Sequence, residues 1–176
     1  MFCTERITLR SMTEADTTIY HKWKNDLEVM TNTSPYLDTY SFEETKHFVN
    51  NVILNSDNAK SYLITDSETN HPIGVTSLVN IDWKNRNAAC IIDIGEKNYW
   101  GKGYGKEALS LLLGYAFMEL NLHRVSLSVY AFNARAIHLY TKLGFTKEGE
   151  TRQDIFKTEN GITQSPWDCF QMNIKP

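Results

Sequence analysis

The stretch YWGKGYGKEA at residues 99–108 has the residue types and spacing of an anion-binding loop. It carries three glycines and two lysines around Tyr104, and apolar helix-forming sequence follows without a break. The first N–H groups of a helix lack partners within the helix, and the helix dipole places about half a positive charge there. Glycines at the entrance let an anion reach those groups, so phosphate is the expected ligand. From this stretch alone, a glycine-rich turn without a ligand is the alternative.

Neither of the two common phosphate loops fits this spacing. A Walker loop has four residues between its glycines and a Ser or Thr after its lysine. Here three residues separate Gly101 from Gly105, and Lys106 is followed by an acidic residue. The Rossmann fingerprint places its third glycine one residue later, at the position of Lys106. The spacing therefore excludes both of these nucleotide-binding loops.

The elements that must position this loop follow from apolar periodicity and capping residues. Ser41 and Glu44 form a capping box, and a second helix runs from an Asn133 cap to Gly144. The order of the expected helices and strands predicts one domain over residues 1–176 of the α/β (α+β) class, with a mixed, mostly antiparallel sheet of about seven strands and flanking helices. We expect helices at 13–25, 41–53, 105–120 and 133–145, and strands at 6–10, 61–65, 72–81, 87–94, 124–130, 146–156 and 167–173.

Composition and charge exclude several classes of protein. A formal net charge of −3 and a sequence pI near 5.9 give no overall basic field, so we do not expect nucleic-acid binding. The widely spaced Cys3, Cys90 and Cys169 favour free thiols in a reducing compartment, and hence the cytoplasm. The sequence shows neither an apolar run of membrane-spanning length nor a signal peptide, and its histidines are scattered. We therefore expect neither a membrane protein nor a metal site.

Two motifs in this order resemble the GNAT superfamily of N-acetyltransferases. They are the glycine loop WGKGYGK after one strand, and N-x-x-A-x-x-x-Y-x-K-x-G-F from Asn133 to Phe145 after the next. The opening RITLRSMTEAD and the segment NLHRVSLSVYAFNARAIHLYTKLGF are most similar to the branch holding the RimJ/RimL-like protein acetyltransferases and the spermidine N-acetyltransferases. The resemblance implies an acyltransferase that uses acetyl-CoA as co-substrate and no metal. The acetyl group would pass to a primary amine (a polyamine, a protein or peptide N-terminus or another small amine) by direct attack in a ternary complex.

The resemblance also assigns residues to acetyl-CoA. The loop would hold the pyrophosphate through its N–H groups, with its lysines adding charge and Trp100 standing where the family often has Gln or Arg. Strand 87–94 would splay from strand 124–130 and expose main-chain groups to the pantetheine arm. The implied contacts are Ile92, Asp93 and Ile94 in the strand, and Trp100, Gly101, Lys102, Gly103, Tyr104, Gly105 and Lys106 in the loop.

The helix from Asn133 supplies the remaining assignments that the resemblance implies. Tyr140 matches the family tyrosine that protonates the departing thiolate, and a thiol pKa near 8.5 beside a phenol pKa near 10 makes this transfer reasonable. Asn133 would hydrogen-bond the pantetheine amide, and Arg135 and Lys142 could reach the 3′-phosphate. Structural roles are the alternatives: Tyr140 and Tyr104 as core residues, Asn133 as a helix cap, and the cations as solvated side chains.

The sequence does not single out the group that removes the proton from the amine. Deprotonating an alkylammonium with a pKa near 10.4 costs roughly 4.6 kcal/mol at pH 7. Many relatives in this branch carry Glu where this chain has Ala89; Asp93 has the same strand parity, and a water relay is equally open. The loop DLEVMTNTSPYLDTY carries Asp26, Glu28 and Asp38, which could attract a cationic amine or could simply be solvated.

Two alternatives compete with this interpretation. Cys90 could act as a ping-pong nucleophile, although a small core residue is the favoured role. An acyl-CoA-binding sensor or regulator with little or no turnover would keep the cofactor site, and Ala89 is the main argument for it. Tyr140 favours the enzyme. We further expect a homo-oligomer, with a dimer as the favoured state.

Overall fold

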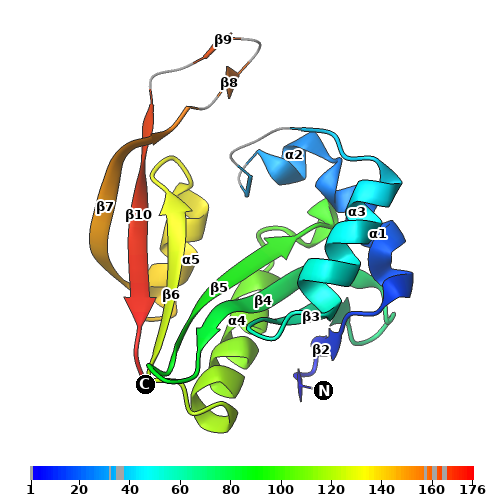
Figure 1. Cartoon of the computed structure of the whole chain (residues 1–176), viewed down its shortest axis with the longest axis horizontal. Coiled ribbons are helices and arrows are strands. Elements are labelled where there is room, and N and C mark those ends of the chain that lie inside the picture. The colour runs from blue at the N-terminus through cyan, green and yellow to red at the C-terminus, as the bar shows by residue number, and fades with distance from the viewer. Residues whose placement is uncertain (1, 32, 35–37, 157, 160–161, 164–165) are drawn as a thin grey trace.

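An eight-stranded sheet runs through the computed structural model in the order β1-β2-β3-β4-β5-β6-β10-β7 (Figure 1). The structure describes residues 2–31, 33–34, 38–156, 158–159, 162–163 and 166–176. Neighbouring strands are antiparallel except β5 and β6, which are parallel. The strands are β1 (Phe2–Cys3), β2 (Ile7–Ser11), β3 (Lys60–Asp66), β4 (Pro72–Asp82), β5 (Asn87–Ile94), β6 (Arg124–Tyr130), β7 (Thr146–Ile155) and β10 (Trp167–Ile174).

The prediction of a mixed, mostly antiparallel sheet with flanking helices is confirmed, and the seven expected strands are all present. The eighth strand, β1, has two residues, which is too short to show a period of two. A separate short hairpin pairs β8 (Thr158–Glu159) with β9 (Ile162–Thr163), where the sequence TENG predicts a turn. Asn160 and Gly161 of that turn lie outside the described residues.

The helices begin where their capping residues predict. The Ser41 hydroxyl accepts from the Glu44 N–H at 3.2 Å, and the Asn133 side chain accepts from the Ala136 N–H at 3.1 Å. The helix α2 was not predicted and lies within the expected loop 26–40. The α-helices are α1 (Thr17–Lys24), α2 (Leu27–Met30), α3 (Phe42–Phe48), α4 (Tyr104–Gly114) and α5 (Ala134–Lys142). Two 3-10 helices, η1 (Glu14–Asp16) and η3 (Lys97–Tyr99), and two π-helices, η2 (Val49–Leu54) and η4 (Tyr115–Glu119), complete the set within the described residues.

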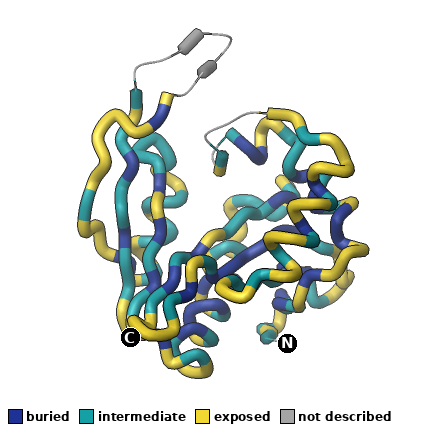
Figure 2. The backbone as a smooth tube through the Cα atoms, viewed as in Figure 1, coloured by how far each residue is buried: buried dark blue, intermediate teal, exposed yellow. Residues whose placement is uncertain are grey.

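Helices cover both faces of the sheet. The predicted apolar stripe of α4 is buried at Leu109, Leu112 and Leu113, α4 packs against β2, β4 and β5, and α5 lies on the same side. On the other face, α1 and α3 with η2 bury Tyr20 and Val49 in a second cluster. Figure 2 shows the central strands as largely buried while much of the outward surface of α3 is exposed. Each fully buried leucine contributes roughly 1.5–3 kcal/mol of transfer free energy, so this layering holds the sheet in place.

The sheet opens between β5 and β6. The two strands pair only at Asn87↔Arg124, Ala88↔Val125 and Ala89↔Ser126. Beyond these pairs β5 continues along β4 while β6 continues along β10, so the two strands diverge (Figure 1). The predicted splayed strand pair is therefore present. The gap between the strands places unpaired main-chain groups at the centre of the molecule.

Candidate active site

The glycine loop lies between η3 and α4, at the end of β5. Gly101 and Gly103 have φ values of +73° and +89°, in the left-handed region that side chains disfavour. A Cβ at Gly101 would meet nothing within 4 Å, so backbone conformation rather than space requires glycine there. Gly103 is the N-cap of α4 and offers no side chain to its first N–H groups. The arrangement leaves these donors to a ligand, as an anion site at a helix N-terminus requires.

Trp100 contacts both sides of the gap. Its Nε1 donates to the main-chain oxygen of Ile94, at the end of β5, over 2.7 Å. The guanidinium of Arg135, from the first turn of α5, lies 5.1 Å from the centre of the indole ring. Trp100 therefore positions the loop against β5 and brings a cation of α5 to the same place.

Arg6, the residue before β2, fixes the loop and was not predicted as part of the site. Its guanidinium donates to the Lys102 main-chain oxygen at 3.2 Å and to the Glu107 carboxylate, and lies 4.6 Å from the centre of the Tyr104 ring. Tyr104 also packs edge-on against Tyr99, which favours its structural role. The side chains of Lys102 and Lys106 are exposed. They remain available to a phosphate.

The main chain of β5 alternates between β4 and the gap. The Ile91 oxygen accepts from Thr76 of β4, and the Asp93 oxygen lies against Gly74 of β4. Peptide groups alternate along a strand, so those of Ile92 and Ile94 face the gap, as the Trp100 bond to Ile94 shows. The carbonyl of Asp93 turns to β4, and the contacts of Ile92, Asp93 and Ile94 with pantetheine stay predictions. The side chain of Asp93 is the part that could reach a ligand.

Tyr140 and Asn133 lie on α5, beside the gap. Burial raises the pKa of Tyr140, and the nearby Cys90 and Asp93 raise it further. Within the described residues its hydroxyl makes no hydrogen bond, so it can donate to a ligand. Asn133 acts as the helix cap, and its contact with pantetheine stays a prediction. So does the role of Lys142, which is exposed in the last turn of α5.

Asp93 is a titratable group on β5, in the part of the strand that borders the gap. Burial raises its pKa to about 6, and Lys24 of α1 opposes that rise. Burial raises the pKa of Tyr20 of α1, and the charge of the same carboxylate raises it further. The carboxyl group therefore interacts electrostatically with α1 and with Tyr140. Burial also raises the pKa of Cys90 to about 12, so this thiol stays protonated and the core role is favoured over a nucleophile.

The acids of the segment after α1 have partners within the chain. Lys97 Nζ lies 2.9 Å from carboxylate oxygens of both Asp26 and Glu28. Asp26 also caps α2 by accepting from the Glu28 N–H at 3.0 Å. The expectation that these two acids attract a cationic amine is therefore not supported, because Lys97 already neutralises them. Asp38 is exposed.

Asp93→Asn is expected to raise the free energy of unfolding by about 1–3 kcal/mol at pH 7.5. The folded-state pKa of Asp93 is raised, so the carboxylate costs stability above pH 6, and this cost disappears as the pH falls below the unfolded value of 3.8. Urea unfolding of both proteins at pH 7.5 and at pH 3.5 measures the free energy of unfolding with this carboxyl group charged and neutral. Asp66→Asn is the control and is expected to lower the free energy of unfolding at pH 7.5. The N–H groups of Thr69 and Glu68 donate to the Asp66 carboxylate and lower its pKa, so this carboxylate stabilises the fold. Equal stability of wild type and Asp93→Asn at pH 7.5 would contradict the burial argument.

These features together define a class of protein. A sheet opened between parallel strands, with a glycine loop at a helix N-terminus and a half-buried tyrosine beside the gap, is an arrangement suited to an acyl-CoA-dependent acyltransferase. The Acetyltransferase (GNAT) domain family matches residues 6–146, and the chain belongs to this family. It is an N-acetyltransferase with acetyl-CoA as its co-substrate.

Several similar proteins are named as N-acetyltransferases. The chain is 34% identical over 151 residues to an uncharacterized N-acetyltransferase p20 of Bacillus licheniformis, covering 85% of this chain and 84% of the relative. It is 31% identical over 153 residues to a spermidine N(1)-acetyltransferase of Vibrio cholerae, covering 86% and 85%. A crystal structure of the spermidine N-acetyltransferase from Vibrio cholerae with CoA and spermine superposes with a TM-score of 0.85 at 27% identity, covering 98% of this chain and 96% of that one.

Within the ranges given above, no helix is long and apolar enough to cross a membrane. Over the same residues, no three His, Cys, Asp or Glu side chains gather in a way that could hold a metal ion.

Proposed function

We propose that Tyr140 and Asp93 carry out the acetyl transfer, as general acid and general base, in a single active site within one domain. The observation that supports this assignment is their position. Both lie where β5 and β6 separate, and the charge of Asp93 acts on Tyr140. Perturbed titratable groups that face one another in an opening of a sheet are typical of catalytic sites.

The proposed reaction is direct attack of the amine on the thioester. Asp93, with a pKa of about 6, accepts the ammonium proton, because a base is most effective when its pKa lies near the working pH. The nitrogen forms a bond to the acetyl carbon while the carbon–sulfur bond breaks, and Tyr140 donates its proton to the leaving thiolate. An N–H of Ile92 or Ile94 in the gap polarises the carbonyl, which is typically worth ~3–4 kcal/mol. The acetylated nitrogen then loses its second proton to solvent as the neutral amide forms, and solvent returns a proton to Tyr140 and removes the one on Asp93.

An amine panel tests this proposal. Purified protein with acetyl-CoA is expected to release CoA only when a primary amine is present, with the acetylated amine as product. The panel includes spermidine, on which the Vibrio cholerae relative acts by name, and a peptide with a free N-terminus. Binding of acetyl-CoA without turnover on any amine would instead favour the sensor or regulator. The RimJ/RimL-like branch and the cytoplasmic location stay predictions.

Gly103→Asp is expected to raise the Kd of CoA at least about 10-fold, because it places a carboxylate beside the pyrophosphate. Gly103→Ala is the matched control, since it carries the same backbone strain at a φ of +89° without the charge. Isothermal titration of CoA to both variants measures the difference. Equal affinities for the two variants would show that the loop does not bind phosphate.

We also propose that the chain forms a homo-oligomer, with a dimer as the expected state. A relative from Vibrio cholerae is dodecameric. Exposed aromatic side chains at Phe156 and Trp167, near the ends of β7 and β10, support an assembly surface. Light scattering behind size exclusion is expected to give a mass above that of one chain, and a monomer at micromolar concentration would contradict the proposal.

A further inference from the structure

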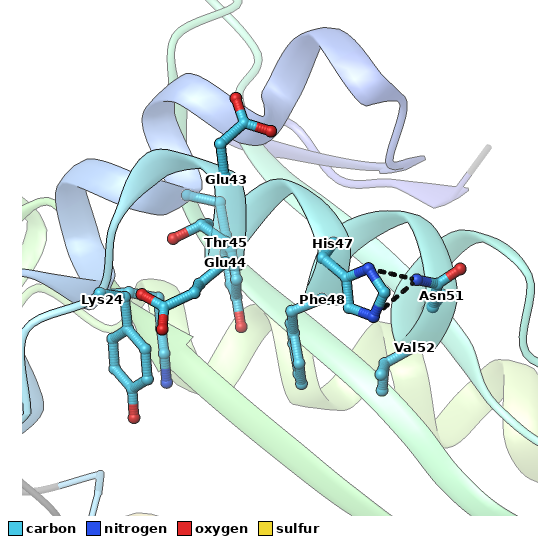
Figure 3. Close-up of a pocket in the computed structure, with 10 residues that line it drawn as sticks. Lys24, Glu43, Glu44, Thr45, His47, Phe48, Asn51 and Val52 are labelled. Atoms are coloured by element: carbon cyan, nitrogen blue, oxygen red, sulfur yellow. Dashed lines mark hydrogen bonds between the residues drawn. The ribbon is translucent and has the colours of Figure 1, made fainter.

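A cavity of about 750 Å³ lies between α1 and the helix formed by α3 and η2. Its apolar lining includes the rings of Tyr20, Tyr40 and Phe48 and the side chain of Val52. Phe48 is 42% exposed and Val52 50% exposed, although both are large apolar residues. Figure 3 shows Lys24, Phe48 and Val52 directed to the same side of the helix. This volume is in the range of small-molecule sites, and its wall is ready to bury an apolar group.

Two side chains of α1 relate the cavity to Asp93. Tyr20 and Lys24 both line it, and both interact electrostatically with Asp93. The Tyr20 ring stacks on Phe48, with centroids 6.2 Å apart and planes within 4° of one another. An acceptor nitrogen held at Asp93 would therefore have the rest of its molecule directed along Tyr20 into the cavity.

The charged residues that line the cavity are Lys24, Glu43 and Glu44. Lys24 is itself a cation, and its ammonium lies 5.9 Å from the centre of the Tyr40 ring. The Glu44 carboxylate is bonded to the N–H and hydroxyl of Ser41, and Figure 3 shows Glu43 pointing away from Phe48 and Val52. His47 is bonded to Asn51. A second ammonium beside Tyr20, Phe48 and Val52 would lose water against apolar side chains and lie near Lys24, while the Glu44 carboxylate is already bonded to Ser41.

We propose that the acceptor is a monoamine whose apolar alkyl or aryl-alkyl body lies in this cavity. The inference rests on the proposed function and names its substrate class. Asp93 takes the ammonium end of the acceptor, and Tyr20, Phe48 and Val52 bury its apolar end. Polyamines are poor acceptors because their additional charges have no partner along this path.

Hexylamine and 1,5-diaminopentane test the proposal, because they have the same length and differ by a methyl or an ammonium group at the far end. We expect kcat/KM for hexylamine to exceed that for the diamine by at least about 10-fold, and that for spermidine by more. A preference for the diamine or for spermidine would overturn the substrate class and leave the acetyltransferase function standing. Turnover on no amine would overturn both.

Val52→Asp supplies the second measurement. A carboxylate in the cavity wall is expected to shift the ratio of the two kcat/KM values by about 10-fold towards the diamine. Val52 is half-exposed, so the fold has room for the change, and a melting-temperature shift on adding acetyl-CoA verifies folding. Leu54→Asp is the matched control on η2, since Leu54 is 36% exposed and does not line the cavity. A ratio unchanged by Val52→Asp would contradict the placement of the acceptor.

Discussion

Tyr140→Phe is expected to lower kcat about 100- to 1000-fold while the Kd of acetyl-CoA changes less than about two-fold. The hydroxyl makes no hydrogen bond within the described residues, so its removal leaves the packing of α5 intact. Its contribution arises only when charge develops on the sulfur. Single-turnover acetylation, followed by quenched flow, measures the chemical step separately from product release.

Tyr115→Phe is the matched control for this change. Tyr115 packs against Phe2 and Tyr62, beyond the end of α4 that is remote from the glycine loop. We expect its kcat to stay within about two-fold of wild type, as for a tyrosine outside the active site. If Tyr140→Phe retained the wild-type single-turnover rate, the thiolate would receive its proton from another group, and Tyr140 would have a packing role only.

Local signals in the sequence account for most of the fold. Capping pairs such as Ser41 with Glu44 act over one helical turn, and strand alternation acts over two residues, so both are visible in the sequence. The two-residue β1 and the four-residue α2 are too short for either signal. Positive φ at Gly101 and Gly103 agrees with a glycine loop, because only glycine adopts this conformation without strain.

Long-range contacts decide the parts of the site that could not be predicted. Arg6 reaches the loop across 96 positions of the chain, and nothing in the sequence around it marks it. Lys97 forms ion pairs with Asp26 and Glu28, so these acids are not available to a cationic amine as the sequence allowed. Strand parity placed Asp93 on the same face of the strand as Ala89 but did not say whether it points into the gap, and its pKa depends on burial and on Lys24. Such effects depend on distances that only the folded chain defines.

Asp93→Asn is expected to lower kcat/KM about 100-fold or more at pH 7, with a deficit that shrinks about 10-fold for each pH unit above it. In the wild type, Asp93 must be ionised to accept a proton, so kcat/KM falls as the pH drops below about 6 and is level above pH 7. Without this base only the neutral amine reacts, and kcat/KM rises steadily towards the pKa of the amine. Profiles from pH 5 to 9.5 with one acceptor measure both variants. A wild-type profile that rises without a break would place the base elsewhere.

Ala89→Glu in the Asp93→Asn background tests whether position or identity of the acid matters. Ala89 lies on the same face of β5 as Asp93 and pairs with Ser126, at the last contact before the strands diverge. A glutamate there could reach the acceptor nitrogen from the point where the strands diverge. We therefore expect kcat/KM at pH 7 to be at least about 10-fold higher in the double variant than in Asp93→Asn, with little difference between the two at pH 9. Ala89→Gln in the same background carries an equal volume without a base and is expected to restore nothing. Equal rescue by both would show that the change acts through packing, whereas rescue by Glu alone requires that a carboxylate beside the gap removes the proton from the amine.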